Sequence, residues 1–357
     1  MKIRYDVISD VGRTRQNNED MALVFGAFIR DDAQQSMVPM ASRPRFTALV
    51  ADGMGGYGGG EIASEMTLRS FADFLRALPA DMDAREVSQA VKEWFRLNND
   101  TIRARAASDP ELANMGCTLT GIFTYGDTEF MLNAGDSRVY RLRYDTLRQL
   151  STDHSERNRT GDPTVPSNLI YNAAGVEGGF VDVTNLTEEM PVIDGDVYVI
   201  CSDGLCDMIS DERIEEILRQ GGGARELTDA ALDAGGLDNC TVIVLRIAGE
   251  PLEQPESVPA ESTDVSEPEN AEAAAEETPS ETLKTLPPAA PIAGFSIDDE
   301  EPSEPSEPSE PSADAEEEIT EEEASRLVPG EPTAAERRKM AAGRLRDALG
   351  SLLGRKK

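Results

Sequence analysis

Residues 46–56 read Phe-Thr-Ala-Leu-Val-Ala-Asp-Gly-Met-Gly-Gly, an apolar run followed at once by an acid and a group of glycines. The run that ends at Ala51 has the length of one buried strand, and Asp52-Gly53 is typical of the turn after such a strand. A strand fixes its own backbone, so the residue at its exit can aim a short carboxylate into the space beyond the sheet. We therefore expect Asp52 to lie at the end of a buried strand and to face a site.

The same pattern recurs elsewhere in the first 248 residues. Acids stand beside glycine or another polar residue, next to apolar runs, at Glu19-Asp20, Asp136, Asp203-Gly204 and Asp238-Asn239. One Asp-Gly pair is a common turn, but several converging carboxylates repel one another unless cations lie between them. Oxygen ligands favour hard ions such as Mg²⁺ or Mn²⁺, and one histidine in 357 residues argues against a zinc hydrolase. The pattern predicts a divalent-cation site.

The periodicity of this region predicts strands in hairpins and helices in pairs. Gly126-Asp127 between two strand-like runs is a hairpin signal, and helical spacing covers 62–78 and then 87–102 with no strand between them. We expect strands at 3–7, 46–51, 118–125, 129–134, 139–142, 181–185, 197–201 and 241–247. We also expect a helix at 209–218, with Ser210 or Asp211 as its N-cap, and a further helix that ends with residues 229–234. This order favours an α+β fold, an antiparallel β sandwich flanked by helices, over a doubly wound parallel sheet.

The net charge of −34 is distributed unevenly along the chain. Residues 249–331 hold 26 acidic and 2 basic residues, with Glu-Pro-Ser repeats, whereas residues 332–357 hold 2 acidic and 8 basic ones. The acidic stretch has too little apolar surface to offset its ordering entropy. We expect a folded domain at 1–248, a disordered acidic Glu/Pro/Ser-rich linker at 249–331 and a basic amphipathic helix at 332–357.

Composition also restricts location and partners. No apolar run is long enough for a transmembrane helix and the N-terminus has no signal-peptide core, so we expect a soluble, cytoplasmic protein. The acidic balance disfavours nucleic acid as a partner. The basic C-terminal helix could contact anionic lipid weakly, a partner groove or the acidic linker. The cysteines form no CxxC pair and lie in or beside apolar runs, which predicts buried reduced thiols at Cys117, Cys201, Cys206 and Cys240.

Seven short motifs, taken in order, resemble those of the bacterial type 2C (PPM-type) metal-dependent Ser/Thr protein phosphatases. The motifs are RQNNED at 15–20, VADGMGG at 50–56, GCT at 116–118, NAGDSR at 133–138, TDHS at 152–155, SDGL at 202–205 and DNCT at 238–241. They stand in the family's order at family-like intervals, from about residue 2 to residue 246. The resemblance implies a four-layer α-β-β-α sandwich of two antiparallel sheets flanked by helix pairs, which agrees with the periodicity.

The resemblance also implies a role for each matching residue. Two Mn²⁺ or Mg²⁺ ions would share Asp52 as a bridging ligand, and Arg15 would bind the substrate phosphate. A bidentate guanidinium–phosphate contact suits Arg15 for this task. The implied metal ligands are Glu19, Asp20, Asp52, the Gly53 carbonyl, Asp203 and Asp238, with Asp136 and Asp207 at a weaker third metal site.

The implied reaction is hydrolysis of phosphoserine or phosphothreonine on proteins. A hydroxide that bridges the two metal ions would attack phosphorus, and no phosphoenzyme would form. The metals and Arg15 would neutralise charge on the equatorial oxygens. The substrates would be proteins phosphorylated by a cognate bacterial Ser/Thr kinase, and we expect the phosphatase to be a monomer.

Two places differ from the usual family pattern. Some members have a histidine just after the Asp-Gly as general acid, but this chain has Met54, which cannot donate a proton. The acid is therefore open between a metal-bound water and His154, whose alternative role is that of a hydrogen-bonded structural residue beside the site. The segment 156–167, which we call the flap, is also shorter than in most relatives.

Two other functions compete with this interpretation. Cys240 and Arg246 have the C-x5-R spacing of cysteine phosphatases, but the apolar, β-branched residues between them cannot form a phosphate-binding loop. The second is a non-catalytic type 2C fold, a regulatory or scaffolding module that acts through its tail. Loss of a core ligand would favour that module, and Asp52, Asp203 and Asp238 are all present.

Overall fold

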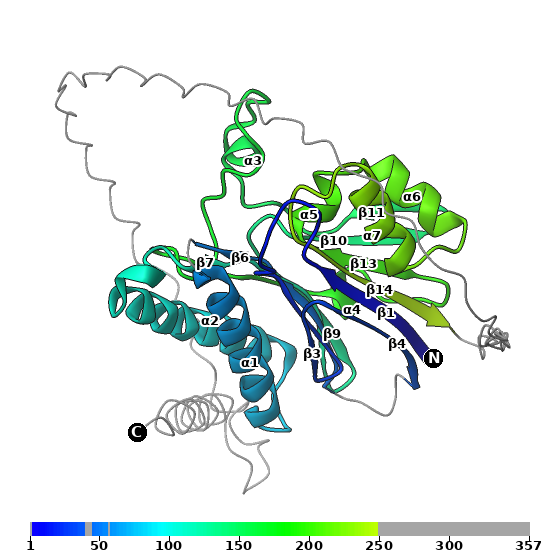
Figure 1. The fold of residues 1–357 in the computed structure, drawn as a ribbon. Coiled ribbons are helices and arrows are strands. Elements are labelled where there is room, and N and C mark those ends of the chain that lie inside the picture. Colours follow the sequence, from blue (N-terminus) through cyan, green and yellow to red (C-terminus); the bar gives the residue numbers. More distant parts are fainter. Residues whose placement is uncertain (1, 40–44, 56–57, 249–357) are drawn as a thin grey trace, which may run out of the picture. The chain divides into compact units, whose positions relative to one another are not determined.

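The computed structural model describes residues 2–39, 45–55 and 58–248 (Figure 1). Within this part of the chain the strands form two six-stranded antiparallel sheets and one short ribbon. The first sheet has the order β11 (Thr146–Gln149), β10 (Arg138–Arg143), β13 (Val197–Cys201), β14 (Cys240–Ala248), β1 (Lys2–Asp10) and β4 (Asp32–Pro39). The second has the order β12 (Asp182–Asn185), β9 (Thr128–Ala134), β8 (Leu119–Tyr125), β5 (Thr47–Ala51), β2 (Met21–Val24) and β3 (Ala27–Ile29). The ribbon pairs β6 (Gly53–Met54) with β7 (Gly116–Cys117).

Three hydrophobic clusters hold the layers together. One lies between the sheets and includes Ile3, Val50 and Ile200. A second joins the outer face of the first sheet to α6 (Asp211–Arg219) and α7 (Ala224–Asp233). The third joins the second sheet to α1 (Gly59–Ala77) and α2 (Ala84–Ala107), and the two helix pairs lie on opposite sides of the sheets in Figure 1. The predicted α+β fold, a four-layer α-β-β-α sandwich, is confirmed.

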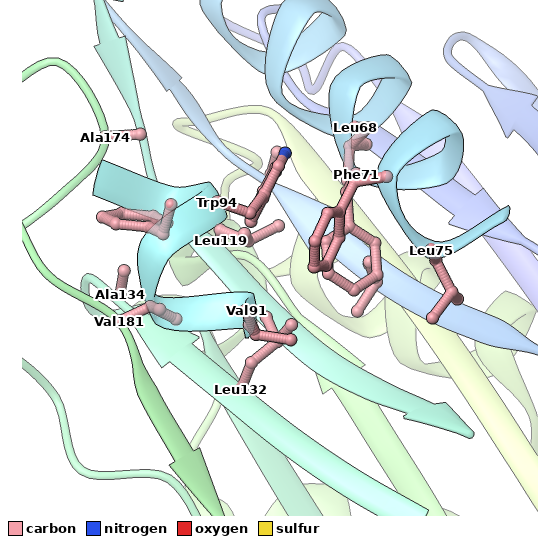
Figure 2. Packing of buried hydrophobic residues seen from close by; sticks show 14 of the residues in the cluster. Leu68, Phe71, Leu75, Val91, Trp94, Leu119, Leu132, Ala134, Ala174 and Val181 are labelled. Atoms are coloured by element: carbon pink, nitrogen blue, oxygen red, sulfur yellow. The ribbon is translucent and has the colours of Figure 1, made fainter. Parts of the chain in front are cut away.

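Helix α2 shows how the sequence forms one of these outer layers. Asp83 and Glu86 make a capping box, in which each side chain accepts from the other's backbone N–H. The apolar residues that follow at helical spacing turn toward the second sheet (Figure 2). Trp94 meets Phe71 of α1 edge to face, with ring centroids 4.9 Å apart, a geometry that aromatic pairs favour.

The strand register brings several strand ends to one end of the sandwich. Ala51 at the end of β5 pairs with Met21 at the start of β2. In the first sheet, β13 ends opposite the start of β14, since Cys201 pairs with Val242. Antiparallel neighbours therefore place the end of one strand beside the start of the next, and the acids that follow or precede these strands share that end.

Several elements differ from the sequence-based expectation. Strands β2, β3, β4 and β11 and the short helices α3 (Glu156–Thr160), α4 (Leu186–Glu189), α5 (Asp203–Cys206) and the 3-10 turn Pro110–Leu112 were not expected. Strand β4 is exposed over most of its length, so it lacks the alternation that reveals a half-buried strand. Helix α6 starts at Asp211, two residues beyond the start of the predicted range, and its N-cap is Ser210, one of the two predicted caps. The linker and basic helix expected at 249–331 and 332–357 lie outside the described residues.

No helix in the described ranges combines the length and the apolar character needed to cross a bilayer.

Candidate active site

The strand ends surround one cavity of about 620 Å³. Five of the predicted acids and Arg15 contribute to this end of the sandwich from both sheets. The residues that line the cavity are Arg15, Gln16, Asn17, Glu19, Asp52, Gly53, Met54, Gly55, Gly58, Thr118, Asp136, Asn168, Ile170, Asp203, Asp238 and Asn239. The predicted Asp20 and Asp207 are not among them: Asp20 is fully buried beside β2, and Asp207 is exposed at the end of α5.

Asp20 is a buried carboxylate that is only half satisfied. Its Oδ2 accepts a hydrogen bond from the Ser202 hydroxyl at 2.7 Å, whereas its Oδ1 is buried with no hydrogen-bond partner. Burial raises the pKa of Asp20 to about 7, against the hydrogen bonds from Ser202 and Thr241, and the charges of Asp203 and Asp238 raise it further. A buried acceptor without a partner is costly, so this oxygen is suited to a ligand.

Asp52 and Asp203 are neighbouring carboxyl groups whose ionisation depends on each other. Their side chains hydrogen-bond to each other across the two sheets. Burial and the neighbouring charges of Asp20, Asp203 and Asp136 raise the pKa of Asp52 well above its ordinary value. Burial raises the pKa of Asp203 to about 6, although the bond from Asp52 lowers it.

Asp136 and Asp207 both lie close enough to Asp203 for their charges to interact with it. Burial, followed by the charge of Asp203, raises the pKa of Asp136 to about 7. Asp207 is exposed but partly desolvated by its neighbours, which raises its pKa, whereas the nearby Arg138 lowers it. Behind them, Arg138 Nη2 donates to Asp153 Oδ2 at 2.7 Å and Nε donates to both carboxylate oxygens. Arg138 thus supplies a positive charge to an acidic cluster that has few others.

Glu19 and Asp238 both interact with Arg15, which lies in the loop 11–18. Burial raises the pKa of Glu19, and the Arg15 guanidinium lowers it. Asp238 Oδ2 accepts from Arg15 Nη2 at 2.6 Å. Both predicted functional groups, the phosphate-binding guanidinium and a metal-ligating carboxylate, are brought together here as partners of one another.

The donor set fits hard divalent ions. Its groups are carboxylates whose pKa values are raised, and one of their oxygens, Asp20 Oδ1, is buried without a hydrogen-bond partner. Cations would compensate the charge of such oxygen ligands. Among the described residues, no three His, Cys, Asp or Glu side chains already stand in a ready-made metal-ligand arrangement. The carboxylates instead interact with one another, with the Ser202 hydroxyl or with the Arg15 guanidinium. On metal binding they would exchange these partners for the ions.

Two glycines allow the backbones of this site to pack closely. A Cβ at Gly204 would lie 1.8 Å from the Asn239 carbonyl oxygen. A Cβ at Gly53 would lie 2.4 Å from the Gly60 oxygen and 2.5 Å from that of Glu19. The glycine that follows Asp52 and Asp203 is therefore required by close approach, since no side chain fits.

Three polar residues position the acids and were not assigned a role from the sequence. Thr118 Oγ1 accepts from the Asp52 N–H at 3.0 Å, and the Thr118 N–H donates to the Asp52 carbonyl at 2.8 Å. Asn239 accepts from the Glu19 N–H at 2.9 Å. Ser202, which binds Asp20, also accepts from the Thr241 N–H at 3.0 Å. All three lie within the motifs at 116–118, 202–205 and 238–241. Their place in these motifs is the sequence feature from which a role could have been predicted.

Met54, at the position of the missing acid, and His154, the side-chain candidate for that role, have different surroundings. Met54 lines the cavity and packs against Gly116, with its Cε 3.2 Å from where a Gly116 Cβ would be. His154 is buried, does not line the cavity, and has both ring nitrogens engaged by Gly135, Asn172 and Asp182. The geometry therefore favours the structural role of His154 over that of an acid.

The cysteines are all free in the described domain. Cys117, Cys201 and Cys240 are buried, and Cys206 is partly exposed. Burial raises the pKa of the Cys117 thiol to about 12. Cys240 lies in β14 with its thiol pKa also raised by burial, so it does not have the environment of a nucleophile.

Comparison with known proteins finds similarity to serine/threonine phosphatases. Residues 26–229 match the protein phosphatase 2C family. The chain is 34% identical over 251 residues to the serine/threonine phosphatase stp of Listeria innocua, an alignment that covers 66% of this chain and 93% of that protein. It is also 34% identical over 255 residues to the serine/threonine protein phosphatase PstP of Mycobacterium tuberculosis, covering 68% of this chain and 44% of the relative.

Solved structures give the same result for the fold. The Mycobacterium tuberculosis serine/threonine phosphatase PstP/Ppp has a TM-score of 0.54 and 30% identity, over 70% of this chain and all of that one. A structure of the catalytic domain of PstP in complex with two manganese ions has the same TM-score, identity and coverage. PppA of Pseudomonas aeruginosa has a TM-score of 0.55 and 29% identity, over 68% of this chain and 97% of that one.

Proposed function

The chain belongs to the protein phosphatase 2C family and is a protein-serine/threonine phosphatase, and from this premise we propose that it hydrolyses phosphoserine and phosphothreonine on proteins with divalent metal ions held in the cavity at the strand ends. The observation that carries the proposal is the convergence of Asp52, Asp136, Asp203 and Asp238 with Arg15 around one cavity. A basic group among acids is the arrangement that a metal-assisted phosphate site requires.

The ligands follow from the positions of the acids. Asp52 comes from the second sheet and Asp203 from the first, and they already contact each other, so Asp52 is suited to bridge two ions. The proposed ligands of two Mn²⁺ or Mg²⁺ ions are Glu19, Asp20, Asp52, the Gly53 carbonyl, Asp203 and Asp238. Asp136, whose pKa is raised by burial and by the charges of Asp203 and Asp207, would hold a weaker third ion together with Asp207. The bound ions would supply an activated water and would neutralise charge on the phosphate.

The protein's own groups orient the phosphate ester. Arg15 reaches the cavity from the loop 11–18, with half of its side chain exposed, and its guanidinium can meet two phosphate oxygens. Thr118 and Asn239 hold the backbones of Asp52 and Glu19 so that these acids stay in place while a substrate binds. The cavity lining also includes Asn168 and Ile170, which follow the flap in the sequence, and the protein substrate would contact the enzyme there.

The biological setting is also a proposal. The substrates would be proteins phosphorylated by a partner Ser/Thr kinase, and the phosphatase would act in the cytoplasm as a monomer in signalling. The relatives named above are serine/threonine phosphatases, which supports protein substrates and leaves the scaffolding alternative without a lost ligand to favour it.

The test is phosphate release from a phosphothreonine peptide by the full chain. We expect activity with Mn²⁺ or Mg²⁺, none after EDTA treatment, and recovery when the metal is restored. Asp52→Asn and Asp203→Asn should each abolish turnover, whereas Asp73→Asn, an exposed acid of α1 paired with Arg76, is the matched control. Full activity of either site variant, or activity that survives EDTA, would contradict the proposal.

A further inference from the structure

His154 occupies a position that the proposed reaction does not use. It is the single histidine of the chain, 3% exposed, and lies directly before the flap. Its hydrogen bonds determine where its proton is. Nδ1 lies 3.1 Å from the Gly135 backbone nitrogen, and a backbone N–H can only donate. Nδ1 must therefore be an acceptor.

Asn172 settles the same point independently. Its Oδ1 accepts from the Phe180 N–H at 2.9 Å, and its Nδ2 donates to the Phe180 carbonyl at 3.0 Å. These backbone groups fix the orientation of the amide, so the Nδ2 that lies 2.7 Å from His154 Nδ1 also donates. With two donors at Nδ1, the imidazole carries its proton on Nε2, which lies 3.0 Å from Asp182 Oδ2.

His154 bonds both backbone groups of Gly135, the residue that precedes Asp136. The Gly135 backbone N–H donates to Nδ1 of the His154 ring, and the His154 backbone N–H donates to the Gly135 carbonyl at 2.9 Å. Gly135 has φ +116°, a conformation that favours glycine, so its peptide depends on such bonds to stay in one orientation. Asp136, the next residue, lines the cavity.

The same histidine also joins the two stems of the flap. The Tyr171 N–H donates to the His154 carbonyl at 2.9 Å, and Ser155 pairs with Ile170 as an isolated bridge. Phe180 and Tyr171 pack against the imidazole, with ring centroids 5.1 and 5.7 Å away. Ile170 lines the cavity that Asp136 also lines.

We infer that His154 is a positioning residue: as a neutral, Nε2-protonated imidazole it orients the Gly135 peptide, and through it the Asp136 carboxylate, and it couples this carboxylate to the base of the flap. The inference rests on the proposed function in one respect, since the consequence of orienting Asp136 is metal affinity. Partners behind a ligand typically change metal affinity about 10- to 100-fold when removed.

The first measurement needs no metal. In untagged, ¹⁵N-labelled full chain, a long-range ¹H–¹⁵N spectrum shows the tautomer of the one imidazole. A scalar coupling through the N–H···N hydrogen bond should connect the Gly135 nitrogen with His154 Nδ1. A proton on Nδ1, or no coupling to Gly135, would overturn the inference.

The second measurement is Mn²⁺ titration of the full chain with free Mn²⁺ followed by electron paramagnetic resonance. His154→Leu leaves the Gly135 N–H without an acceptor and should weaken at least one bound Mn²⁺ by about 10- to 100-fold. His154→Asn, whose oxygen can accept at the Nδ1 position, should restore most of the affinity. In a double variant with Asp136→Asn, His154→Leu should cause little further loss, because both act on the same carboxylate.

Controls separate positioning from general destabilisation. Ile214→Ala truncates a buried residue of α6 and should lower stability without changing Mn²⁺ affinity. If wild-type chain binds Mn²⁺ and His154→Leu binds it equally well, the inference fails while the proposed function stands. If wild-type chain binds no Mn²⁺, the proposed function fails and the metal consequence with it. Should His154→Leu not fold, His154→Asn and the imidazole spectrum still decide, since loss of affinity in His154→Asn together with a missing coupling contradicts the inference.

Discussion

Arg15 Nη2 donates a hydrogen bond to Asp238 Oδ2 over 2.6 Å, although the two residues lie 223 positions apart in the sequence. The pair is partly exposed, with 50% of the Arg15 side chain and 36% of that of Asp238 accessible, so either partner can leave it at little cost. An ion that takes Asp238 would release the guanidinium toward the phosphate. Metal and phosphate binding would then favour each other.

Replacing Arg15 by alanine is the direct check of this relationship. Without the guanidinium, the transition state loses one charged hydrogen-bond donor. The kcat/KM for a phosphopeptide should therefore fall by about 10²- to 10³-fold. Mn²⁺ affinity should stay the same or rise, because Asp238 loses a competing partner. Arg13→Ala, which removes a pair with the exposed Asp233, is the matched control. A large loss of Mn²⁺ affinity in Arg15→Ala would show that the arginine supports the metal site instead.

Replacing Asp136 by asparagine should weaken metal binding but stabilise the metal-free fold. In the metal-free chain, burial and the charge of Asp203 raise the pKa of the Asp136 carboxyl group. At about pH 8 the group is ionised, and its charge therefore opposes folding. Asp136→Asn should therefore increase the free energy of unfolding in EDTA, on the order of 1–3 kcal/mol, while weakening Mn²⁺ binding. Urea denaturation with and without Mn²⁺ measures both effects. Lower stability of the variant in EDTA would contradict the repulsion.

The pH dependence of stability follows from the same shifts. Asp20 and Asp136 have pKa values of about 7 in the fold against an ordinary 3.8, so the folded chain binds more protons than the unfolded chain between these values. Their contribution is fully present below the unfolded pKa of 3.8 and is lost as pH rises through about 7. In EDTA, Tm should fall from about pH 5 to about pH 8, and the slope should be smaller in Asp136→Asn. With Mn²⁺ present the trend should reverse, since ligands must be deprotonated to bind metal.

The sequence predicted those parts of the site that depend on local pattern. Asp52, Asp136 and Asp203 each follow an apolar run, and each lies beyond the end of a buried strand. The strand register then brings them together, which the antiparallel hairpins made predictable. The antiparallel sandwich flanked by helices was predictable for the same reason, since apolar periodicity reflects burial, whereas its four layers were implied by the family resemblance.

Long-range side-chain pairing could not be predicted in this way. The bond between Arg15 and Asp238 depends on where a loop crosses the sheets, and no local pattern encodes that. The exposed β4 has no burial alternation, and its place at the sheet edge comes only from pairing with β1. The hydrogen bonds of His154 bring together segments at 135, 172 and 182, so its role was visible only in three dimensions.

The glycine after Asp203 should tolerate no side chain. A Cβ at Gly204 would lie 1.8 Å from the Asn239 carbonyl, a backbone atom that cannot move without shifting Asp238 and the start of β14. Gly204→Ala should lower Tm and abolish turnover together. Gly161→Asn is the control, because nothing lies within 4 Å of that position and asparagine accepts the positive φ of 68° there. Wild-type Tm and activity in Gly204→Ala would contradict the close approach.

A chain that ends after Ala248 should fold and remain active. Strand β14 lies inside the first sheet, paired with β13 on one side and β1 on the other, and Ala248 pairs with Lys2 as the last step of that ladder. Ending the chain there removes no described strand and no residue of the cavity. We expect a single cooperative unfolding transition and Mn²⁺-dependent hydrolysis of p-nitrophenyl phosphate close to that of the full chain. Ending the chain at Cys240 removes all but the first residue of β14, so that shorter chain should not fold. An insoluble or inactive 1–248 chain would place the domain boundary further along, within the acidic segment.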